Sequence, residues 1–265
     1  MKEPIRIAFA NQKGGVGKTT LTIQIAGAAA ADRKSKILLV DTDPQGNMSK
    51  FFLDKEYQTA PLTINDLVVN DTPAQDIVRK TKWKQIDIIP CNLAFGDVDI
   101  KLAMADDAQF RLKEALTDIE SKYDYVILDC APNLLRATRM ALTYASFFIV
   151  PVEPGEWAAS GANQLTATVE AIKKRSNPGL VFLGIVINKL LSRRRYESDM
   201  IKAIRNLYGE MVFKSIIRNV PIFAEANSTH KLIANKSHSQ EEPVMAIKSL
   251  FKEITERVEK FYEPA

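Results

Sequence analysis

Short runs of apolar residues alternate along the chain with longer stretches in which apolar residues recur every three or four positions. The apolar runs predict β-strands at 5–10, 36–41, 86–90, 125–130, 147–152 and 182–188. The periodic stretches predict helices, among them 21–33, 110–122, 161–175 and 196–209. Strands that are apolar on both faces and separated by helices indicate a mostly parallel sheet with helices on both sides. The predicted fold class is a three-layer α/β domain.

Composition and length narrow the protein class. The chain has 265 residues, no internal repeat and no evident linker, so we expect a single domain over residues 1–265. Its two cysteines, Cys91 and Cys130, are far apart, which argues against a disulfide framework or a zinc site. No apolar stretch approaches the ~18 residues that a membrane-spanning helix needs. These features predict a cytoplasmic protein.

A glycine-rich loop, "KGGVGKT" at 13–19, joins the first predicted strand to the first predicted helix. Its glycines allow successive backbone N–H groups to point at phosphate oxygens, and the helix start adds a positive dipole. In a P-loop of this kind Lys18 reaches the β- and γ-phosphates and the Thr19 hydroxyl binds Mg²⁺. The loop departs from the general P-loop pattern because Gln12 stands where that pattern has glycine.

Three acidic residues follow predicted strands, namely Asp41, Asp43 and Asp129. Because ligands of parallel sheets bind at the carboxyl ends of the strands, we expect these acids to gather beside the glycine loop. The turn-forming segments 44–47 and 131–133 come next and are expected to order on a γ-phosphate as switch loops. Asp41 is interpreted as a structural acid or an outer-shell magnesium group. A helix cap or turn role is the alternative for each acid.

Five segments resemble the ParA/MinD family of P-loop ATPases. "KGGVGKTT" at 13–20 resembles the deviant Walker A motif, and "YDYVILDCAP" at 123–132 is similar to the Walker B region. The segments 38–47, 152–165 and 216–226 are similar to ParA sequences, so the resemblance spans residue 5 to about residue 260. It implies a P-loop NTPase fold in one domain, with ATP and Mg²⁺ as cofactors and ATP hydrolysis at a slow basal rate.

The resemblance also assigns residues to the site. It implies a catalytic set of Lys13, Lys18 and Asp43, with Asp43 positioning or activating the attacking water. The implied nucleotide-binding set is Lys13, Gly14, Gly15, Val16, Gly17, Lys18, Thr19, Thr20 and Asn188. Thr19 would bind Mg²⁺ directly, and Asp43 and Asp129 would hold it through water. Asn188 would pair with adenine through its amide, together with the loop 217–221.

Lys13 raises a separate question, because Lys18 already serves the phosphates. The resemblance implies that Lys13 reaches across a two-fold axis to the nucleotide of a second subunit, which makes an ATP-dependent homodimer. From the residues alone, the alternative is a solvated lysine on a loop.

Basic residues cluster late in the chain, although the net charge is only +4. The resemblance implies that they bind double-stranded DNA without sequence preference, through phosphate neutralisation. The candidates are Arg193, Arg194, Arg195, Lys202 and Arg205, and also Arg218, which we expect in a loop. A solvated basic face is the alternative. Lys173, Lys174 and Arg175 end a predicted helix and are interpreted as partners of its dipole.

The C-terminal stretch 246–262 predicts an amphipathic helix with one apolar face, formed by Ile247, Leu250, Phe251, Ile254, Val258 and Phe261. We expect this helix to pack on the domain. The alternative is a membrane anchor of the MinD type, which Glu253, Glu256 and Glu259 disfavour.

Together these features predict a ParA-type ATPase that moves or spaces plasmid or chromosomal DNA with a ParB-type centromere-binding activator. We expect it to be cytoplasmic, associated with the nucleoid in its ATP state and not bound to membrane. No segment precedes the first strand that would read a DNA sequence, so a repressor role is not expected. The alternatives are a MinD-like membrane-cycling regulator and a ParA-like positioner of a protein cargo. A nitrogenase-reductase-like electron carrier is disfavoured by the cysteine spacing.

Overall fold

The computed structural model describes residues 3–32, 35–59, 61–154, 159–191, 195–235 and 241–263, and within them eight strands form one central sheet. Their order is β3-β4-β2-β5-β1-β6-β7-β8, and every pairing is parallel except that of β3 with β4. The strands are β1 Ile5–Phe9, β2 Ile37–Asp41, β3 Arg79–Lys80, β4 Ile86–Ile89, β5 Tyr125–Asp129, β6 Phe147–Val152, β7 Val181–Leu190 and β8 Val212–Arg218. The predicted fold class is confirmed.

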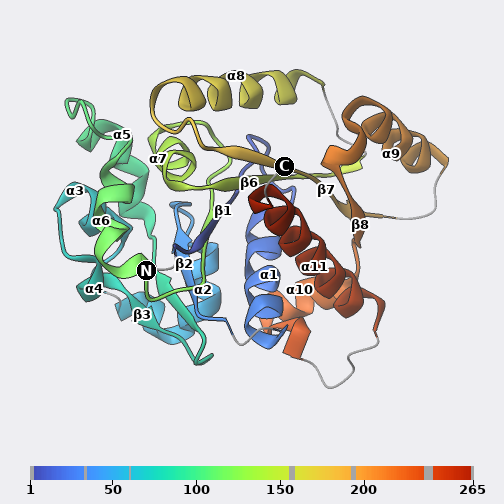
Figure 1. Cartoon of the computed structure of the whole chain (residues 1–265). Coiled ribbons are helices and arrows are strands. Elements are labelled where there is room, and N and C mark those ends of the chain that lie inside the picture. The colour runs from blue at the N-terminus through green and yellow to red at the C-terminus, as the bar shows by residue number, and fades with distance from the viewer. Residues whose placement is uncertain are drawn as a thin grey trace.

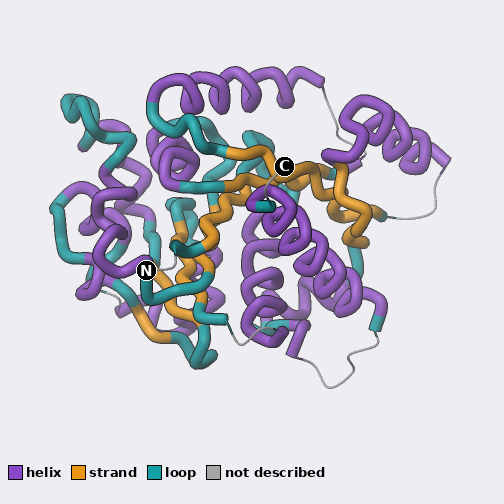
Figure 2. Tube along the Cα trace, in the orientation of Figure 1, coloured by secondary structure: helices purple, strands orange, loops and turns teal. Residues whose placement is uncertain are grey.

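Helices cover both faces of the sheet (Figures 1 and 2). They are α1 Lys18–Asp32, α2 Asn47–Leu53, α3 Ile64–Val69, α4 Ala74–Ile77, α5 Val98–Lys101, α6 Arg111–Glu120, α7 Arg136–Tyr144, α8 Ala159–Arg175, α9 Arg195–Tyr208, α10 Pro221–Ser228 and α11 Glu242–Tyr262. One layer contains α1, α2, α10 and α11, and the other contains α3 to α9.

Successive side chains of each central strand point to opposite faces of the sheet, and both faces are covered, which explains why these strands are apolar throughout. In β5, Tyr125 and Ile127 belong to the core cluster under α1 and α11, whereas Val126 and Leu128 belong to the cluster on the opposite face. All five residues of β5 are buried. A strand buried on both faces has no polar side, which is why a continuous apolar run predicts it.

The register of the central strands assembles the site. Asp41 at the end of β2 lies opposite Asp129 at the end of β5, and Phe9 at the end of β1 lies opposite the same aspartate. The glycine loop follows β1 directly. The predicted gathering of strand-end acids beside the loop is therefore confirmed for Asp41 and Asp129.

The eighth strand, β8, corrects one sequence-based prediction. Arg218 was expected in a loop, but it is the last residue of β8, where its Nε atom lies 2.9 Å from Glu242 Oε1. Ile217, expected in the loop 217–221, is likewise a buried strand residue. The sequence pattern did not predict this strand because Lys214 and Ser215 interrupt its apolar run.

The C-terminal helix α11 packs on the domain, as predicted. Its buried residues include Val244, Ile247, Leu250, Phe251, Ile254 and Val258, all within the core cluster shared with α1. Phe261 is the exception to the predicted face, because its side chain is about half exposed. No described helix is long and apolar enough to cross a membrane.

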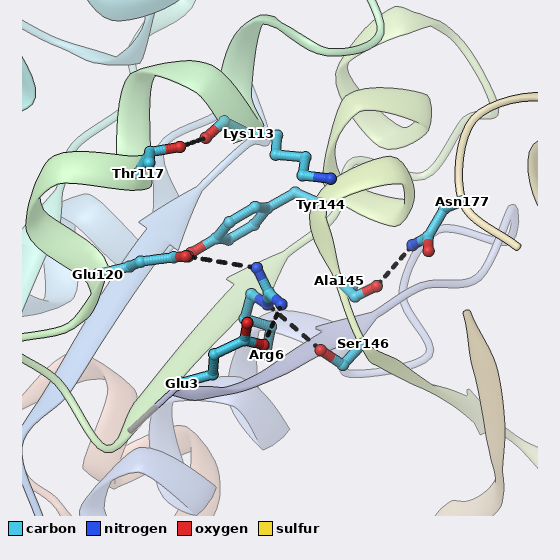
Figure 3. Close-up of polar contacts among 9 residues, drawn as sticks. All are labelled: Glu3, Arg6, Lys113, Thr117, Glu120, Tyr144, Ala145, Ser146 and Asn177. Atoms are coloured by element: carbon cyan, nitrogen blue, oxygen red, sulfur yellow. Dashed lines mark hydrogen bonds and ion pairs between the residues drawn. The ribbon is translucent and has the colours of Figure 1, made fainter. Parts of the chain in front are cut away.

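A polar cluster ties elements together at the amino end of the sheet, opposite the acids (Figure 3). The Tyr144 hydroxyl donates to Glu120 Oε2 at 2.6 Å, and Arg6 Nη1 donates to the same carboxylate at 3.4 Å. Arg6 also donates from Nε to Ser146 Oγ at 3.3 Å. Burial, together with the bond to Glu120, raises the pKa of Tyr144. The cluster joins β1, α6 and α7 far from the candidate site.

A second polar cluster fastens α11 to β8. Glu253 accepts hydrogen bonds from the backbone N–H groups of Lys214, at 2.9 Å, and Ser215, at 3.1 Å. Arg257 Nη2 donates to Glu253 at 3.0 Å, and Arg257 Nη1 donates to the Leu183 carbonyl at 2.9 Å. Burial alone would raise the pKa of Glu253, but these hydrogen bonds and the charge of Arg257 together lower it below its usual value.

We expect Glu253→Gln to lower the free energy of unfolding at pH 7 by about 1–2 kcal/mol, because a charged acceptor is lost. A carboxyl whose pKa is lower when folded stabilises the fold above its unfolded pKa, and this contribution is lost as pH falls through the folded pKa. The difference between wild type and variant should therefore shrink below about pH 4.5. Urea unfolding across a pH series measures it.

The matched control is Glu256→Gln on the same helix. Glu256 is exposed and pairs only loosely with Lys252, at 3.7 Å. Its loss should change stability by less than about 0.5 kcal/mol. The role given to Glu253 is contradicted if the two substitutions lower the free energy of unfolding equally, or if the difference between wild type and Glu253→Gln does not change with pH.

Candidate functional site

The glycine loop wraps through two left-handed positions. Gly15 has φ 79° and Gly17 has φ 87°, a region that residues with a side chain rarely adopt. A Cβ atom on Gly17 would also collide with the side-chain amide of Asn188. The Asn188 Nδ2 atom donates to the Val16 carbonyl at 2.7 Å. The loop is thus fixed against β7 at a point where only glycine fits.

The two lysines of the loop have different environments. Lys18 opens α1 and is buried, with 5% of its surface exposed, whereas Lys13 is exposed at the front of the loop. Lys18 Nζ donates to the Lys13 carbonyl at 3.0 Å. Burial lowers the pKa of Lys18, while the charges of Asp129 and Asp43 oppose that shift. Lys18 points back under the loop, and Lys13 lies at its surface.

An asparagine that the sequence analysis missed anchors the start of the loop. Asn11 Oδ1 accepts from the Lys13 backbone N–H at 3.0 Å, and Asn11 Nδ2 donates to the Pro151 carbonyl on β6 at 2.7 Å. An asparagine two residues before an exposed loop residue is a common turn signal. This signal was present in the sequence, but the contact with β6 was not visible there.

Asp41, the last residue of β2, and Asp43, which follows the strand, have different hydrogen-bond partners. Asp41 is fully buried, and it accepts from the backbone N–H of Asp43 at 3.1 Å and from the Ser49 hydroxyl at 2.7 Å. Asp41 therefore joins the strand end to α2, as a structural acid does. Asp43 accepts from the Gln45 backbone N–H at 2.9 Å, so one carboxylate oxygen shapes the predicted switch loop at 44–47.

Asp129 lacks such partners. It is fully buried, and neither carboxylate oxygen has a hydrogen-bond partner among the described residues. Burial raises its pKa well above the usual range, the charges of Asp41 and Asp43 add to that, and Thr19 and Lys18 oppose it. An unpaired buried carboxylate is costly, and a divalent cation would compensate for it. The residues present therefore fit a magnesium ion beside Asp129 and Thr19.

A cavity of about 340 Å³ lies beside the start of α1, between α2 and α10. Thr19 and Thr20 line it, together with Lys50 from α2 and Asn227 from α10. Asn227 Nδ2 donates to the Thr20 hydroxyl at 3.2 Å, and the Oδ1 atom of Asn227 is buried without a partner among the described residues. The sequence analysis did not single out Asn227.

The candidate DNA-binding residues do not form one cluster in the described part of the chain. Arg193 and Arg194 lie outside the described residues, and Arg195 begins α9. On the same helix Lys202 is exposed, and Arg205 Nη2 donates to the Phe213 carbonyl at 3.4 Å. Arg218 is paired with Glu242, as described above. The described basic side chains are thus partly committed to contacts within the protein.

Comparison with known proteins adds independent information. A sequence model of a protein family, described as an AAA domain, matches residues 5–182. The chain is 35% identical to the sporulation initiation inhibitor protein Soj of Bacillus subtilis, over 86% of this chain and 89% of that protein. It is 34% identical to the chromosome partitioning protein ParA of Myxococcus xanthus, over 81% of this chain and 75% of that protein.

A solved structure with a similar fold carries ligands. It is cobyrinic acid a,c-diamide synthase from Mycobacterium smegmatis with a bound ATP analogue and magnesium. Its TM-score is 0.81 at 27% identity, over 94% of this chain and 93% of that one. This chain therefore shares its fold with a solved protein that holds an ATP analogue and magnesium.

Proposed function

The chain belongs to the ParA/Soj family of chromosome-partitioning P-loop ATPases, and from this premise we propose that it dimerises on ATP, binds DNA without sequence preference and positions plasmid or chromosomal DNA. The observation that carries the proposal is the division between its two loop lysines, Lys18 buried under the loop and Lys13 exposed at the front. In this proposal Lys18 serves the nucleotide of its own subunit, and Lys13 reaches the nucleotide of a second subunit.

The residues of the loop bind ATP in this proposal. Backbone N–H groups of residues 14–20 and the Lys18 ammonium surround the phosphates. Thr19 would hold Mg²⁺ directly, and Asp43 and Asp129 would hold it through water. When bound, the ion would supply positive charge that neutralises the phosphates. Asp43 also orients the attacking water and accepts its proton.

Asn188 is proposed to recognise adenine, and its position supports that role in part. Its side chain is buried beside the loop, and one amide hydrogen is used by the Val16 carbonyl. A primary amide has a second donor hydrogen and a carbonyl acceptor, which suffice for the donor and acceptor edge of adenine.

The dimer follows from symmetry in this proposal. If each Lys13 reaches the partner's phosphates, the two contacts are identical and the interface is isologous. ATP then forms part of the interface, so hydrolysis weakens the dimer. A ParB-type centromere-binding protein is the proposed activator of hydrolysis.

Retention on arbitrary duplex DNA tests the proposed function. We expect retention with ATP and not with ADP, falling steeply as salt rises, because phosphate contacts release counterions. Replacing Arg193 and Arg194 with glutamine should reduce retention and flatten the salt dependence by about one unit of slope per lost contact. Lys113→Gln, on the exposed surface of α6, is the matched control and should leave retention unchanged.

Two results would count against the proposal. If the protein is retained with neither nucleotide, the basic residues form a solvated face and the proposed DNA binding is wrong. Equal retention with ATP and ADP would leave DNA binding but remove its control by the nucleotide.

A further inference from the structure

A hollow of about 430 Å³ lies over α7, on the sheet face away from α1 and α11. Its walls come from α5 on one side and from the last turn of α8 on the other, and these helices lie together in Figure 1. None of the residues assigned to the nucleotide site lines it. The hollow is therefore a surface separate from the ATP site described above.

The hollow is positively charged. Among the described residues, three guanidinium groups line it, from Arg136, Arg139 and Arg175, against one carboxylate, that of Asp99. Asp99 is already engaged by Arg136, whose backbone N–H donates to it at 3.0 Å. Two arginines thus remain whose charge no acid in the hollow balances.

The hollow is also apolar in part. Leu134, Leu135, Ala171 and Ile172 line it beside the arginines, and Leu135 is 54% exposed. A DNA phosphate would match the charge but would gain nothing from the leucines. A protein segment that carries both carboxylates and apolar side chains matches both parts of the surface.

We propose that this hollow binds an acidic, amphipathic segment of a partner protein. Its carboxylates pair with Arg139 and Arg175, and its apolar side chains cover Leu134 and Leu135. Arginine suits this role because its planar group can donate two parallel hydrogen bonds to one carboxylate.

The hollow is connected to the loop that follows Asp129. Arg139 Nε donates to the Leu134 carbonyl at 3.0 Å, and the Leu135 N–H donates to Asn133 Oδ1 at 3.1 Å. A carboxylate that attracts Arg139 competes with the Leu134 carbonyl, at the end of the predicted switch loop. The bound segment thereby alters ATP turnover, a consequence that rests on the proposed function.

The opposite end of the hollow is firmly held. Asn177, which follows α8, donates from Nδ2 to the carbonyls of Ala145, at 2.7 Å (Figure 3), and Leu142, at 3.0 Å. The hydroxyls of Thr143 and Ser176 are 3.0 Å apart and hydrogen-bonded. Movement on binding is therefore expected at the Leu134 end.

Fluorescence anisotropy with a labelled synthetic peptide tests the binding. The probe is a short helical peptide with glutamate on one face and leucine on the other, and two comparison peptides replace every glutamate with lysine or every leucine with serine. We expect the protein to bind the first peptide best. Arg139→Gln combined with Arg175→Gln should weaken that binding by about tenfold.

The matched control is Lys173→Gln combined with Lys174→Gln. It removes the same amount of charge from exposed positions in the last turn of α8, the turn that also carries Arg175, and neither lysine lines the hollow. It should change the affinity by less than about twofold. Arg175 makes no described hydrogen bond or ion pair, so Arg175→Gln alone, compared with Lys173→Gln, serves if the double variant is unstable.

Several outcomes would overturn the proposal. Equal losses in the two double variants would mean unspecific attraction, and equal binding of the lysine peptide would exclude carboxylate recognition. Displacement of the peptide by duplex DNA, with DNA binding lost only in the arginine variant, would assign the hollow to nucleic acid.

The proposed function is tested separately on the same preparations. If nucleotide-gated DNA retention fails while the peptide still binds through Arg139 and Arg175, the partition function is wrong and the docking surface stands. If the peptide binds without changing ATP turnover, the regulatory part is wrong.

Discussion

Replacing Lys13 with alanine is expected to abolish the ATP-dependent dimer while nucleotide binding persists. The substitution removes an exposed side chain but keeps the backbone carbonyl to which Lys18 donates, so the monomer's own phosphate site is preserved. Loss of a desolvated lysine–phosphate contact costs about 2–5 kcal/mol, which weakens the dimer by about 30-fold or more. Light scattering on the protein in solution, with ATP and with ADP, measures its molecular mass and so distinguishes dimer from monomer.

Lys18→Ala provides the comparison. This change removes the buried lysine of the loop, so binding of a fluorescent ATP analogue itself should be lost. If the Lys13 variant still forms the dimer with ATP, Lys13 is a solvated lysine and does not contact the second subunit. If the Lys13 variant loses nucleotide binding, Lys13 acts at the nucleotide of its own subunit, as Lys18 does.

Replacing Asp43 is expected to stop hydrolysis without stopping ATP binding. Loss of a group that activates water lowers the rate by about 10²–10⁴-fold. Asp43→Ala also removes the acceptor for the Gln45 backbone N–H, so a structural effect on the loop has to be separated. Phosphate release under saturating ATP measures turnover, and equilibrium titration measures binding.

Asp43→Asn is the variant that separates the two effects. Asparagine retains an acceptor oxygen for the Gln45 N–H, but it cannot take a proton from water. We expect turnover as low as in the alanine variant, with nucleotide affinity within about threefold of wild type. Normal turnover in Asp43→Asn would refute the role of this residue.

Much of the fold could be predicted because the central strands are buried on both faces. β1, β2, β4 and β5 begin and end within one residue of their predicted bounds, and β6 matches its prediction. The edge strand β8 could not be predicted in the same way. Its polar residues Lys214 and Ser215 are explained by a contact with Glu253, which lies 38 residues or more away in the sequence.

The candidate site shows the same limit. The loop glycines, Lys18 and the strand-end acids form local patterns with known chemistry, so the sequence was enough to bring them together. The hydrogen bond between Asn188 and Val16 joins residues 172 positions apart, and the sequence around either residue does not predict it. The unpartnered carboxylate of Asp129 also depends on what the rest of the fold leaves around it.

Glu253 has a consequence beyond stability. β8 is the last strand of the sheet, and the unpaired donors of such a strand are a template for pairing with another chain. The Glu253 carboxylate occupies two of those donors, the N–H groups of Lys214 and Ser215. Without it, these two N–H donors would be left unpaired at the edge of the sheet, beside α11. The residue that fastens α11 thus also protects the protein against aggregation through strand addition.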